Sequence, residues 1–474
     1  MNGFQLEMQF SSGSNRLREC LENGLFSVWI EHSPPPAGQN HDYMRRTAEA
    51  LEQAAASVTL LPAGLAITDN SGDPAGAVRS IEYASMLDAN TRNRHIVYIS
   101  GCNTTQNEAA ELLGMAANAG ISNIVPVTGN AAAGSTVKKP GIYTESTKML
   151  AGLNGADEFF AGTTVNPFKY SPLPLVGQYA KLMRKINSGA QFVVTQAGFD
   201  MAKLHEVQHY LAMRQCYVPM VARLILLTPE VMADILSGKH PGEVISQESQ
   251  AQLRRELCFS SQQFQAAQWR RLELQAAGCR FLGFSGIQLV GADTPDRLKI
   301  ACTRIANALN EFSSFPDWLA EYEAWVGRAD LSNHTNGFYF FNNLLSSNDD
   351  DIAVPKPVDF DFPAPSGGER LLLAIRQSLF PAYAAYSGGE RTFLTMLFAG
   401  CKGCSDCNLA KTFYVCSRHC PKKLSDGPCG GAAGNGSCEF GSRACIFNQI
   451  TRLAGISGGV DSLETPENGG IKNG

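Results

Sequence analysis

Residues 95–127 read HIVYISGCNTTQNEAAELLGMAANAGISNIVPV, and this stretch decides the fold class. It begins with an apolar run at 95–99, continues with an amphipathic stretch at 105–119, and ends with a second apolar run at 123–127. Short apolar runs are typical of buried strands, whereas apolar residues at helical spacing between them predict a helix. We therefore expect a parallel strand–helix–strand unit here.

The same alternation continues on both sides of this unit. Further strands are predicted at 26–30, 65–67, 159–163, 192–195, 217–227 and 281–284. Further helices are predicted at 44–56, 81–88, 175–188, 201–214, 261–277 and 295–309. Roughly eight strand–helix units over about 285 residues suit a closed (β/α)8 TIM barrel better than an open sheet.

The rest of the chain divides by composition. Residues 352–368 carry four prolines and end in paired glycines, which is typical of a linker. The last residues are Gly-rich and polar, which favours disorder. The predicted parts are an N-terminal extension at 1–24, the barrel at 25–312, a connecting segment and Pro-rich linker at 313–368, a small cysteine-rich metal-binding domain at 369–453 and a disordered tail at 454–474.

Cysteines are concentrated near the C-terminal end of the chain. Eight of the fourteen are Cys401, Cys404, Cys407, Cys416, Cys420, Cys429, Cys438 and Cys445. Thiolates two residues apart can converge on one ion, and three close thiolates with a later Cys-Pro are typical of a [4Fe–4S] cluster. Two clusters, one cluster with zinc, and zinc alone all remain open, because ligand pairing does not follow from cysteine order.

Overall composition limits the possible partners and compartments. The formal net charge is −5, which gives no reason to expect binding to nucleic acid or to a membrane surface. No apolar run approaches the length of a membrane span, and residues 1–12 lack the order of a signal peptide. We therefore expect a cytoplasmic protein, whose clustered cysteines bind metal rather than form disulfides.

Polar residues follow several predicted strands. Glu31 comes directly after the first, where a carboxylate can be desolvated enough to act as a general acid near neutral pH. Thr68, the run Thr128-Gly129-Asn130, and Gln196 follow later strands. Because barrel enzymes carry their chemistry at the C-terminal ends of strands, these residues predict a pocket.

Several short motifs, taken in order, resemble the methylenetetrahydrofolate reductase family over about 280 residues. They are Glu-x-x-Pro-Pro at 31–35, Thr-Asp-Asn at 68–70, the strand from His95, Gly-Ile-x-Asn-Ile-x-x-x-x-Gly at 120–129, and Ser-Gly-Ala…Thr-Gln…Phe-Asp at 188–200. The run Cys420-Pro-Lys, then Gly-Pro-Cys-Gly-Gly at 427–431 and Cys438-Glu439, resembles the cysteine-rich domain found with such reductases in bacteria.

The resemblance implies a flavin-dependent barrel enzyme that interconverts 5,10-methylenetetrahydrofolate and 5-methyltetrahydrofolate by hydride transfer. Glu31 matches the family's proton donor, and Gln196 matches a residue that holds the pterin. The positions that match flavin contacts are Thr68, His95, Thr128, Gly129 and Asn130. FAD is the expected flavin, with FMN as the alternative, and the electron donor is NAD(P)H, ferredoxin or a partner redox subunit.

One departure from the family matters. Thr128-Gly129-Asn130 stands where the family usually has Arg-Gly-Asp, so a phosphate or ribityl donor and a negative charge beside the flavin are missing. No Gly-x-Gly-x-x-Gly follows a predicted strand, so a separate Rossmann-type nicotinamide site is not indicated. A folate methyltransferase without redox chemistry, and a non-catalytic electron-transfer or docking subunit, therefore stay open as alternatives.

Overall fold

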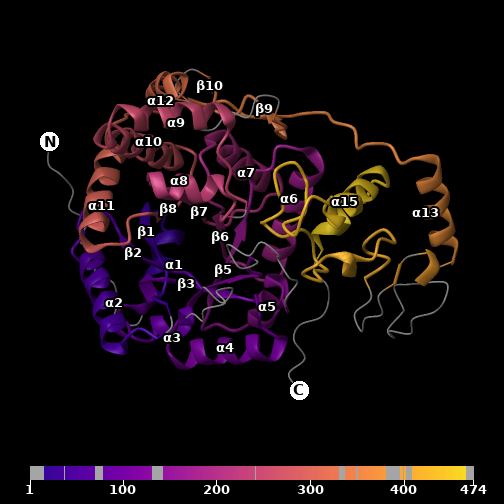
Figure 1. Ribbon diagram of the computed structural model, residues 1–474, viewed down its shortest axis with the longest axis horizontal. Helices are drawn as coiled ribbons and strands as arrows, with labels where there is room; N and C mark the ends of the chain where they lie inside the picture. The colour runs from indigo at the N-terminus through magenta and orange to yellow at the C-terminus, as the bar shows by residue number, and fades with distance from the viewer. Residues whose placement is uncertain are drawn as a thin grey trace.

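The structure is a computed structural model of the chain (Figure 1). It describes residues 15–36, 38–69, 78–130, 142–240, 242–329, 337–348, 351–379, 396–398, 400–401 and 408–465. Cys404 and Cys407, two of the predicted metal ligands, lie outside the described residues.

Within the described residues, eight parallel strands close into a barrel in the order β1 to β8, with β8 returning to pair with β1. The strands are β1 (Ser27–His32), β2 (Ala63–Ile67), β3 (Ile96–Ser100), β4 (Asn123–Val127), β5 (Phe160–Val165), β6 (Phe192–Thr195), β7 (Met220–Ile225) and β8 (Gly286–Val290). The predicted (β/α)8 fold is confirmed.

Helices surround the barrel strands (Figure 1). They are α2 (His41–Ala56), α3 (Ser80–Ala84), α4 (Gln106–Asn118), α5 (Ser146–Leu153), α6 (Pro172–Asn187), α7 (Met201–Met213), α8 (Pro229–Leu236), α9 (Gln247–Phe259), α10 (Ser261–Phe281), α11 (Pro295–Leu309) and α12 (Phe315–Ala329). The last strand was predicted at 281–284, which is wrong. Phe281 ends helix α10, and the strand begins at Gly286.

The barrel interior is closed at its N-terminal end by α1 (Arg16–Glu22). Leu17 and Leu21 of this helix are buried in the same apolar cluster as the inward-facing Phe160 and Phe192. The rings of Phe160 and Phe192 stack with their centroids 5.0 Å apart. The N-terminal end of the barrel is therefore packed, which leaves the opposite end for a pocket.

We predict that Gly162→Ala destabilises the barrel, because a Cβ atom at Gly162 would lie 2.4 Å from the nearest atom of the Phe192 ring. Overpacking of this kind costs about 1–3 kcal/mol. Urea unfolding followed by circular dichroism measures the loss. Gly114→Ala is the matched control, since a Cβ there meets open space on α4 and should be neutral or slightly stabilising. Equal stability of the two variants would contradict the prediction.

The chain leaves the barrel through short two-stranded ladders and returns to pack against α6. The ladders are formed by β9 (Phe341–Asn342) with β12 (Lys356–Pro357), and by β10 (Ser347–Asn348) with β11 (Asp351–Ile352). The next helix, α13 (Gly367–Leu379), lies away from the barrel at the edge of the molecule (Figure 1).

Residues 408–465, called the cysteine-rich module below, contain α15 (Ile446–Ile456) and the 3₁₀ helices η3 (Ser417–His419) and η4 (Val460–Glu464). An apolar cluster that includes Leu424, Phe447 and Ile450 packs against Ala180 of α6. The module therefore docks on the barrel through α6, which lies between β5 and α15 in Figure 1.

The predicted disordered tail is wrong for residues 454–465. Helix α15 continues to Ile456, and η4 follows. The carboxylate of Glu464 accepts hydrogen bonds from Arg214 at 2.6 Å and from Tyr210 at 3.1 Å, both on or next to α7. These long-range contacts order a segment whose composition alone indicates disorder. Residues 466–474 lie outside the described residues.

Candidate active site

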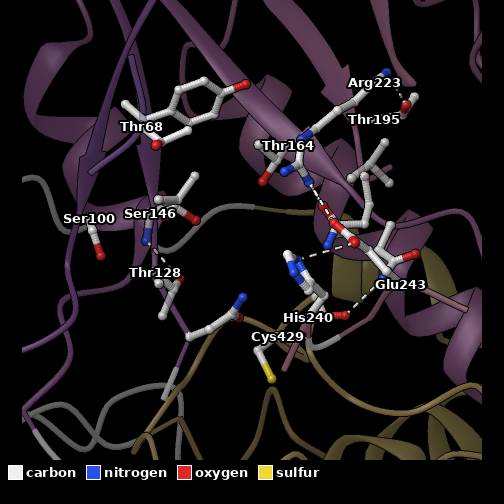
Figure 2. A pocket seen from close by; sticks show the side chains of 18 of the residues that line it. Thr68, Ser100, Thr128, Ser146, Thr164, Thr195, Arg223, His240, Glu243 and Cys429 are labelled. Atoms are coloured by element: carbon white, nitrogen blue, oxygen red, sulfur yellow. Dashed lines mark hydrogen bonds and ion pairs between the residues drawn. The ribbon is translucent and has the colours of Figure 1, made fainter. Parts of the chain in front are cut away.

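A cavity of about 590 Å³ opens at the C-terminal ends of the barrel strands. Every barrel strand contributes a residue that lies between the middle of the strand and the position just after its C-terminal end. These include Glu31, Thr68, Ser100, Thr128, Asn166, Gln196, Arg223 and Gln288. The cavity is called the barrel pocket below. Figure 2 shows it with Arg223, His240 and Glu243 on one side, Thr68, Ser100 and Thr128 on the other, and Cys429 at its edge.

Six of the seven barrel residues predicted to form the site line this pocket. They are Glu31, Thr68, Thr128, Gly129, Asn130 and Gln196. The rule that places barrel chemistry at the C-terminal strand ends therefore brought these residues together correctly. Their roles in catalysis and binding remain proposals.

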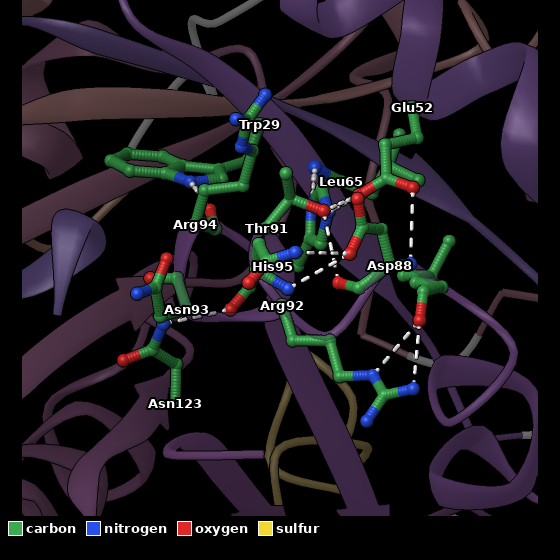
Figure 3. A network of polar contacts seen from close by, with 12 residues as sticks. Trp29, Glu52, Leu65, Asp88, Thr91, Arg92, Asn93, Arg94, His95 and Asn123 are labelled. Carbon is green, nitrogen blue, oxygen red and sulfur yellow. Dashed lines mark hydrogen bonds and ion pairs between the residues drawn. The ribbon is translucent and has the colours of Figure 1, made fainter. Parts of the chain in front are cut away.

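His95 lies apart from the others, at the N-terminal end of β3 (Figure 3). Its Nδ1 accepts the backbone N–H of Leu65 at 3.0 Å, and its Nε2 lies 3.2 Å from the Glu52 carboxylate. The side chain is fully buried among these groups and is not part of the pocket wall. His95 therefore does not line this pocket, because it directly precedes β3 and the pocket lies at the other end of the strands.

Arg223 organises one side of the pocket. Its Nε and Nη2 donate to the two carboxylate oxygens of Glu31 at 2.6 and 2.7 Å. Its Nη1 donates to Gln196 Oε1 at 3.0 Å and to Glu243 Oε1 at 3.1 Å. Gln288 Nε2 adds a further hydrogen bond to Glu31 at 2.6 Å. One guanidinium therefore joins both residues that the sequence predicted to meet the folate.

The two carboxylates around Arg223 have opposite pKa shifts. Burial favours a raised pKa for Glu31, but the charge and hydrogen bonds of Arg223 outweigh it, and the pKa lies below its ordinary value. Burial raises the pKa of Glu243, and Arg223 and His240 offset this only in part. The expectation that desolvation makes Glu31 a general acid is not met in this geometry, because Arg223 holds the carboxylate in its ionised form.

Three residues of the pocket were not predicted from the sequence: Arg223, Glu243 and His240. Arg223 lies within the apolar run of β7, and a charged residue at an inward-facing strand position was the one available signal. Glu243 and His240 belong to the loop between α8 and α9 and carry no recognisable spacing. His240 Nδ1 lies 3.4 Å from Glu243 Oε2.

Gly129 permits the tight backbone at the opposite wall. Its φ is +79°, and a Cβ atom there would lie 2.3 Å from Ser100 Oγ, so only glycine fits. Beside it, Thr128 Oγ1 accepts from the N–H of Ser146 at 3.3 Å, and the carbonyl of Asn130 accepts from Cys102 Sγ at 3.3 Å. The threonine and asparagine that replace the family's arginine and aspartate are thus well-formed parts of the wall.

Two lysines of α6 supply positive charge to the pocket. Lys185 Nζ donates to the carbonyl of Thr164 at 2.7 Å, and burial together with the like charge of Lys181 lowers its pKa to about 7. Lys181 lies 3.4 Å from Glu145. A buried ammonium with a depressed pKa gains free energy when an anion binds next to it. The pocket wall therefore presents a buried cation to any anionic group that binds there.

The cysteine-rich module completes the pocket wall. The carbonyl of Cys429 accepts from Gln178 Nε2 at 2.8 Å, and the carbonyl of Gly430 accepts from Asn166 Nδ2 at 2.9 Å. The same Asn166 amide also donates to the carbonyl of Gly242 at 3.1 Å. Asn166 thus joins the module to the loop that carries Glu243.

A second set of contacts anchors the module beside the pocket. The carboxylate of Glu145 accepts the N–H and the hydroxyl of Ser425, each at 2.7 Å. The fully buried Lys422 donates to the carbonyl of Gly129 at 2.7 Å and pairs with Glu439 at 2.6 Å. The module therefore contacts the backbone of the Thr128–Asn130 wall directly.

Four of the cysteines that were predicted to bind metal lie near one another beside this interface. Burial raises the pKa of Cys420 to about 11 and that of Cys445 to about 12, and the charges of the nearby Cys429 and Cys438 add to both shifts. Among the described residues, which leave out Cys404 and Cys407, no three His, Cys, Asp or Glu side chains are close enough to hold a metal ion. The described geometry thus gathers four predicted ligands without forming a finished metal site.

Comparisons with known proteins agree with this arrangement. Residues 16–235 match the family model described as methylenetetrahydrofolate reductase, and residues 380–467 match the one described as methylene-tetrahydrofolate reductase C terminal. A search of curated proteins found no match. Among the helices that the structure describes, none has the length and apolar character needed to cross a membrane.

One similar solved structure is titled "Uncharacterized protein from Clostridium thermocellum binds two copies of 5-methyl-5,6,7,8-tetrahydrofolic acid". It is 15% identical, with a TM-score of 0.45, over 61% of this chain and 99% of that chain. A likeness of this degree carries no argument about the function of the present chain. The two family models match in the order expected from the sequence, the reductase model over residues 16–235 of the barrel and the C-terminal model over residues 380–467.

Proposed function

We propose that the chain is an oxidoreductase of folate one-carbon metabolism that interconverts 5,10-methylenetetrahydrofolate and 5-methyltetrahydrofolate. The observation that carries this proposal is the barrel pocket, which gathers Glu31, Gln196 and the Thr128–Asn130 wall in a barrel of the reductase family. A bound flavin would supply or accept the hydride. The residues of the chain would bind the folate, stabilise charge and transfer the proton.

In this proposal Gln196 binds the pterin with its amide and Glu31 faces the one-carbon unit. Opening of the methylene bridge leaves a cation at N5 of the folate. Glu31, kept ionised by Arg223, supplies the negative charge that Asn130 lacks. At an effective dielectric of about 20, a carboxylate about 4 Å from a cation contributes roughly 4 kcal/mol. Arg223 would therefore be a positioning residue for Glu31.

For the flavin we propose FAD, with FMN as the alternative, held along Thr68, the Thr128–Asn130 wall and Lys185. Lys185 is the group best suited to a flavin phosphate, because it is a buried cation whose hydrogen-bond acceptor is a neutral carbonyl. In the module, the carbonyl of Gly427 accepts a hydrogen bond from Lys181, and the carbonyl of Cys429 accepts one from Gln178.

We predict that Lys185→Met weakens flavin binding by about 10- to 100-fold, the loss of one charge-assisted hydrogen bond worth roughly 1.5–3 kcal/mol. Titration of the purified apoprotein with FAD and FMN, followed by flavin fluorescence, measures the two dissociation constants. Lys299→Met, which removes an exposed lysine from α11, is the control. Unchanged flavin affinity in the Lys185 variant would remove this residue from the cofactor site.

We also propose that the module holds a metal centre through its cysteines, either iron–sulfur or zinc. The buried Lys169 and Lys422 each interact electrostatically with Cys429. Their positive charges therefore favour an anionic thiolate centre. An iron–sulfur centre at this position would let ferredoxin, a partner redox subunit or another donor deliver electrons beside the pocket. NAD(P)H remains a possible donor. We place this chemistry in the cytoplasm, where thiols stay reduced.

Purification without air, followed by metal analysis, a visible spectrum and a folate assay in both directions, tests the proposal. Flavin bands with folate oxidation or reduction support the oxidoreductase, and a broad iron–sulfur absorption supports electron delivery through the module. A colourless, zinc-replete protein would overturn the electron-delivery role. Methyl transfer to an acceptor without electron consumption would instead favour the folate methyltransferase.

A further inference from the structure

Two carboxylates share one guanidinium on the Arg223 side of the barrel pocket, and they share it unequally. Glu31 receives two N–H groups of Arg223 and a third from Gln288. Glu243 receives one N–H group of Arg223. With both carboxylates ionised, this group carries one surplus negative charge in a desolvated site. Protonation of Glu243, the carboxylate that receives fewer hydrogen bonds, neutralises that charge at the lowest free-energy cost.

His240 offers a second place for the same proton. Its Nδ1 lies 3.4 Å from Glu243 Oε2, and its side chain is 37% exposed, whereas that of Glu243 is 5% exposed. The group is neutral when the proton is on Glu243 and equally when it is on His240. A single proton transfer between His240 and Glu243, which are already in contact, therefore links solvent to the pocket (Figure 2).

We propose that Glu243 and His240 form the proton relay of the barrel pocket. Glu243 exchanges the proton with N10 of the folate, and His240 exchanges it with solvent. This inference rests on the proposed function and assigns to Glu243 the proton transfer that the family resemblance gives to Glu31. Glu31 then stays ionised throughout and stabilises the cation, so two carboxylates have separate tasks.

The step balances in either direction. In the reductive direction the bond between the methylene carbon and N10 breaks, and its electron pair stays on N10. N10 takes the proton of the Glu243 carboxyl, which leaves a cation at N5 and a carboxylate at Glu243. His240 then returns a proton from solvent to Glu243. In the oxidative direction Glu243 accepts the N10 proton and His240 releases it.

The groups that face Glu243 come from three parts of the chain. Arg223 of β7 favours its ionised form, Glu31 of β1 favours its protonated form, and His240 of its own loop favours the ionised form when charged. Burial raises the pKa of Glu243 above its ordinary value, which is the direction that a proton donor requires. Lys239, the remaining charge on this loop, pairs with Asp234 at 2.5 Å.

Kinetics of the full chain with its cofactors, purified without air, test the relay. The variants are Glu243→Gln, Glu31→Gln and His240→Ala, with the exposed carboxyl of α8 removed in Glu230→Gln as the control. With methylenetetrahydrofolate and a reduced viologen dye, Glu243→Gln should lower kcat by about 10²- to 10⁴-fold and leave KM near its original value. It should also abolish the fall of kcat at alkaline pH, whereas Glu31→Gln should move that fall to lower pH, because it removes a charge that raises the pKa of Glu243.

His240→Ala should lose part of the rate and recover it when imidazole is added, because a small base in solution can replace the missing relay. A structural role for His240 predicts no recovery. Wild-type kcat in Glu243→Gln, or a lowered kcat in His240→Ala that imidazole does not restore, would overturn the relay.

An infrared difference measurement without substrate separates this inference from the proposed function. At neutral pH, Glu243→Gln should remove one protonated-carboxyl band, whereas Glu31→Asp, which keeps a negative charge beside Arg223, should leave that band in place. Retention of the band in Glu243→Gln would overturn the assignment of the proton to Glu243. A wild type that turns over no folate in either direction overturns the proposed function and the folate step with it, and the infrared result still decides where the proton resides.

Discussion

Replacing Arg223 with methionine is expected to lower the free energy of unfolding by about 3–5 kcal/mol, the cost of leaving a buried carboxylate without its partner. Arg223 binds Glu31 through two hydrogen bonds and also contacts Gln196 and Glu243, and the Arg223 and Glu31 side chains are only 17% and 13% exposed. Urea unfolding at pH 8 measures the loss. Arg254→Met, on the exposed face of α9, is the control and should change stability little.

The loss of stability in Arg223→Met should become smaller as the pH falls. In the wild type the pKa of Glu31 is lowered, so its stabilising contribution is present above the unfolded-state pKa of about 4.3 and is lost as pH falls through the folded-state value. In Arg223→Met burial is opposed only by the Gln288 hydrogen bond and the charge of His240, so the pKa of Glu31 rises, and that of Glu243 rises further. The variant therefore regains stability on acidification, and its gap from the wild type should shrink between pH 8 and pH 5. A gap that widens would contradict the assignment.

Glu31→Gln is expected to lower folate turnover by about 10²-fold or more while folate binding stays near normal. The amide keeps the shape of the side chain but carries no charge, so the cation formed at N5 loses its nearest anion. A 10²-fold loss corresponds to about 2.7 kcal/mol, within the electrostatic contribution expected from one carboxylate at close range.

Steady-state kinetics and binding of a non-reacting folate, measured on the same preparation, check this prediction. Glu230→Gln serves as the control here too, because its exposed carboxyl lies outside the pocket. Turnover equal to the wild type would exclude Glu31 from the mechanism. Weaker folate binding at unchanged kcat would instead give it a role in substrate binding alone.

The fold could be predicted from sequence because strands and helices alternate in short-range patterns. The segment at 95–127 contains this pattern in full, and β3, α4 and β4 lie where it predicts them. The last strand was misplaced because Phe281–Phe284 is as apolar as a strand, yet its first residue ends the long helix α10. Apolar runs at helix ends are ambiguous by composition, and tertiary packing resolves them.

The site was predictable only where a residue immediately follows its strand. Thr68 and Gln196 obey that rule, and Glu31 follows its predicted strand although β1 itself continues to His32. His95, in contrast, precedes its strand and lies at the other end of the barrel. Arg223 was hidden inside an apolar run. Cys429 reaches the pocket only because the module docks on α6, and no local pattern specifies the docking of one domain on another.

Asn166 binds the carbonyls of Gly242 and Gly430 with the two hydrogens of one amide, and this has a consequence for how the pocket is assembled. Both partners belong to the same polypeptide, so their encounter is intramolecular and is governed by an effective concentration, which reaches the millimolar range for short flexible connections. Neutral hydrogen bonds worth about 0.5–1.5 kcal/mol each are weak links between free proteins but suffice at that concentration. Tethering thus supplies the cysteine-bearing wall to each barrel in fixed one-to-one proportion, and the apolar packing on α6 adds to these hydrogen bonds.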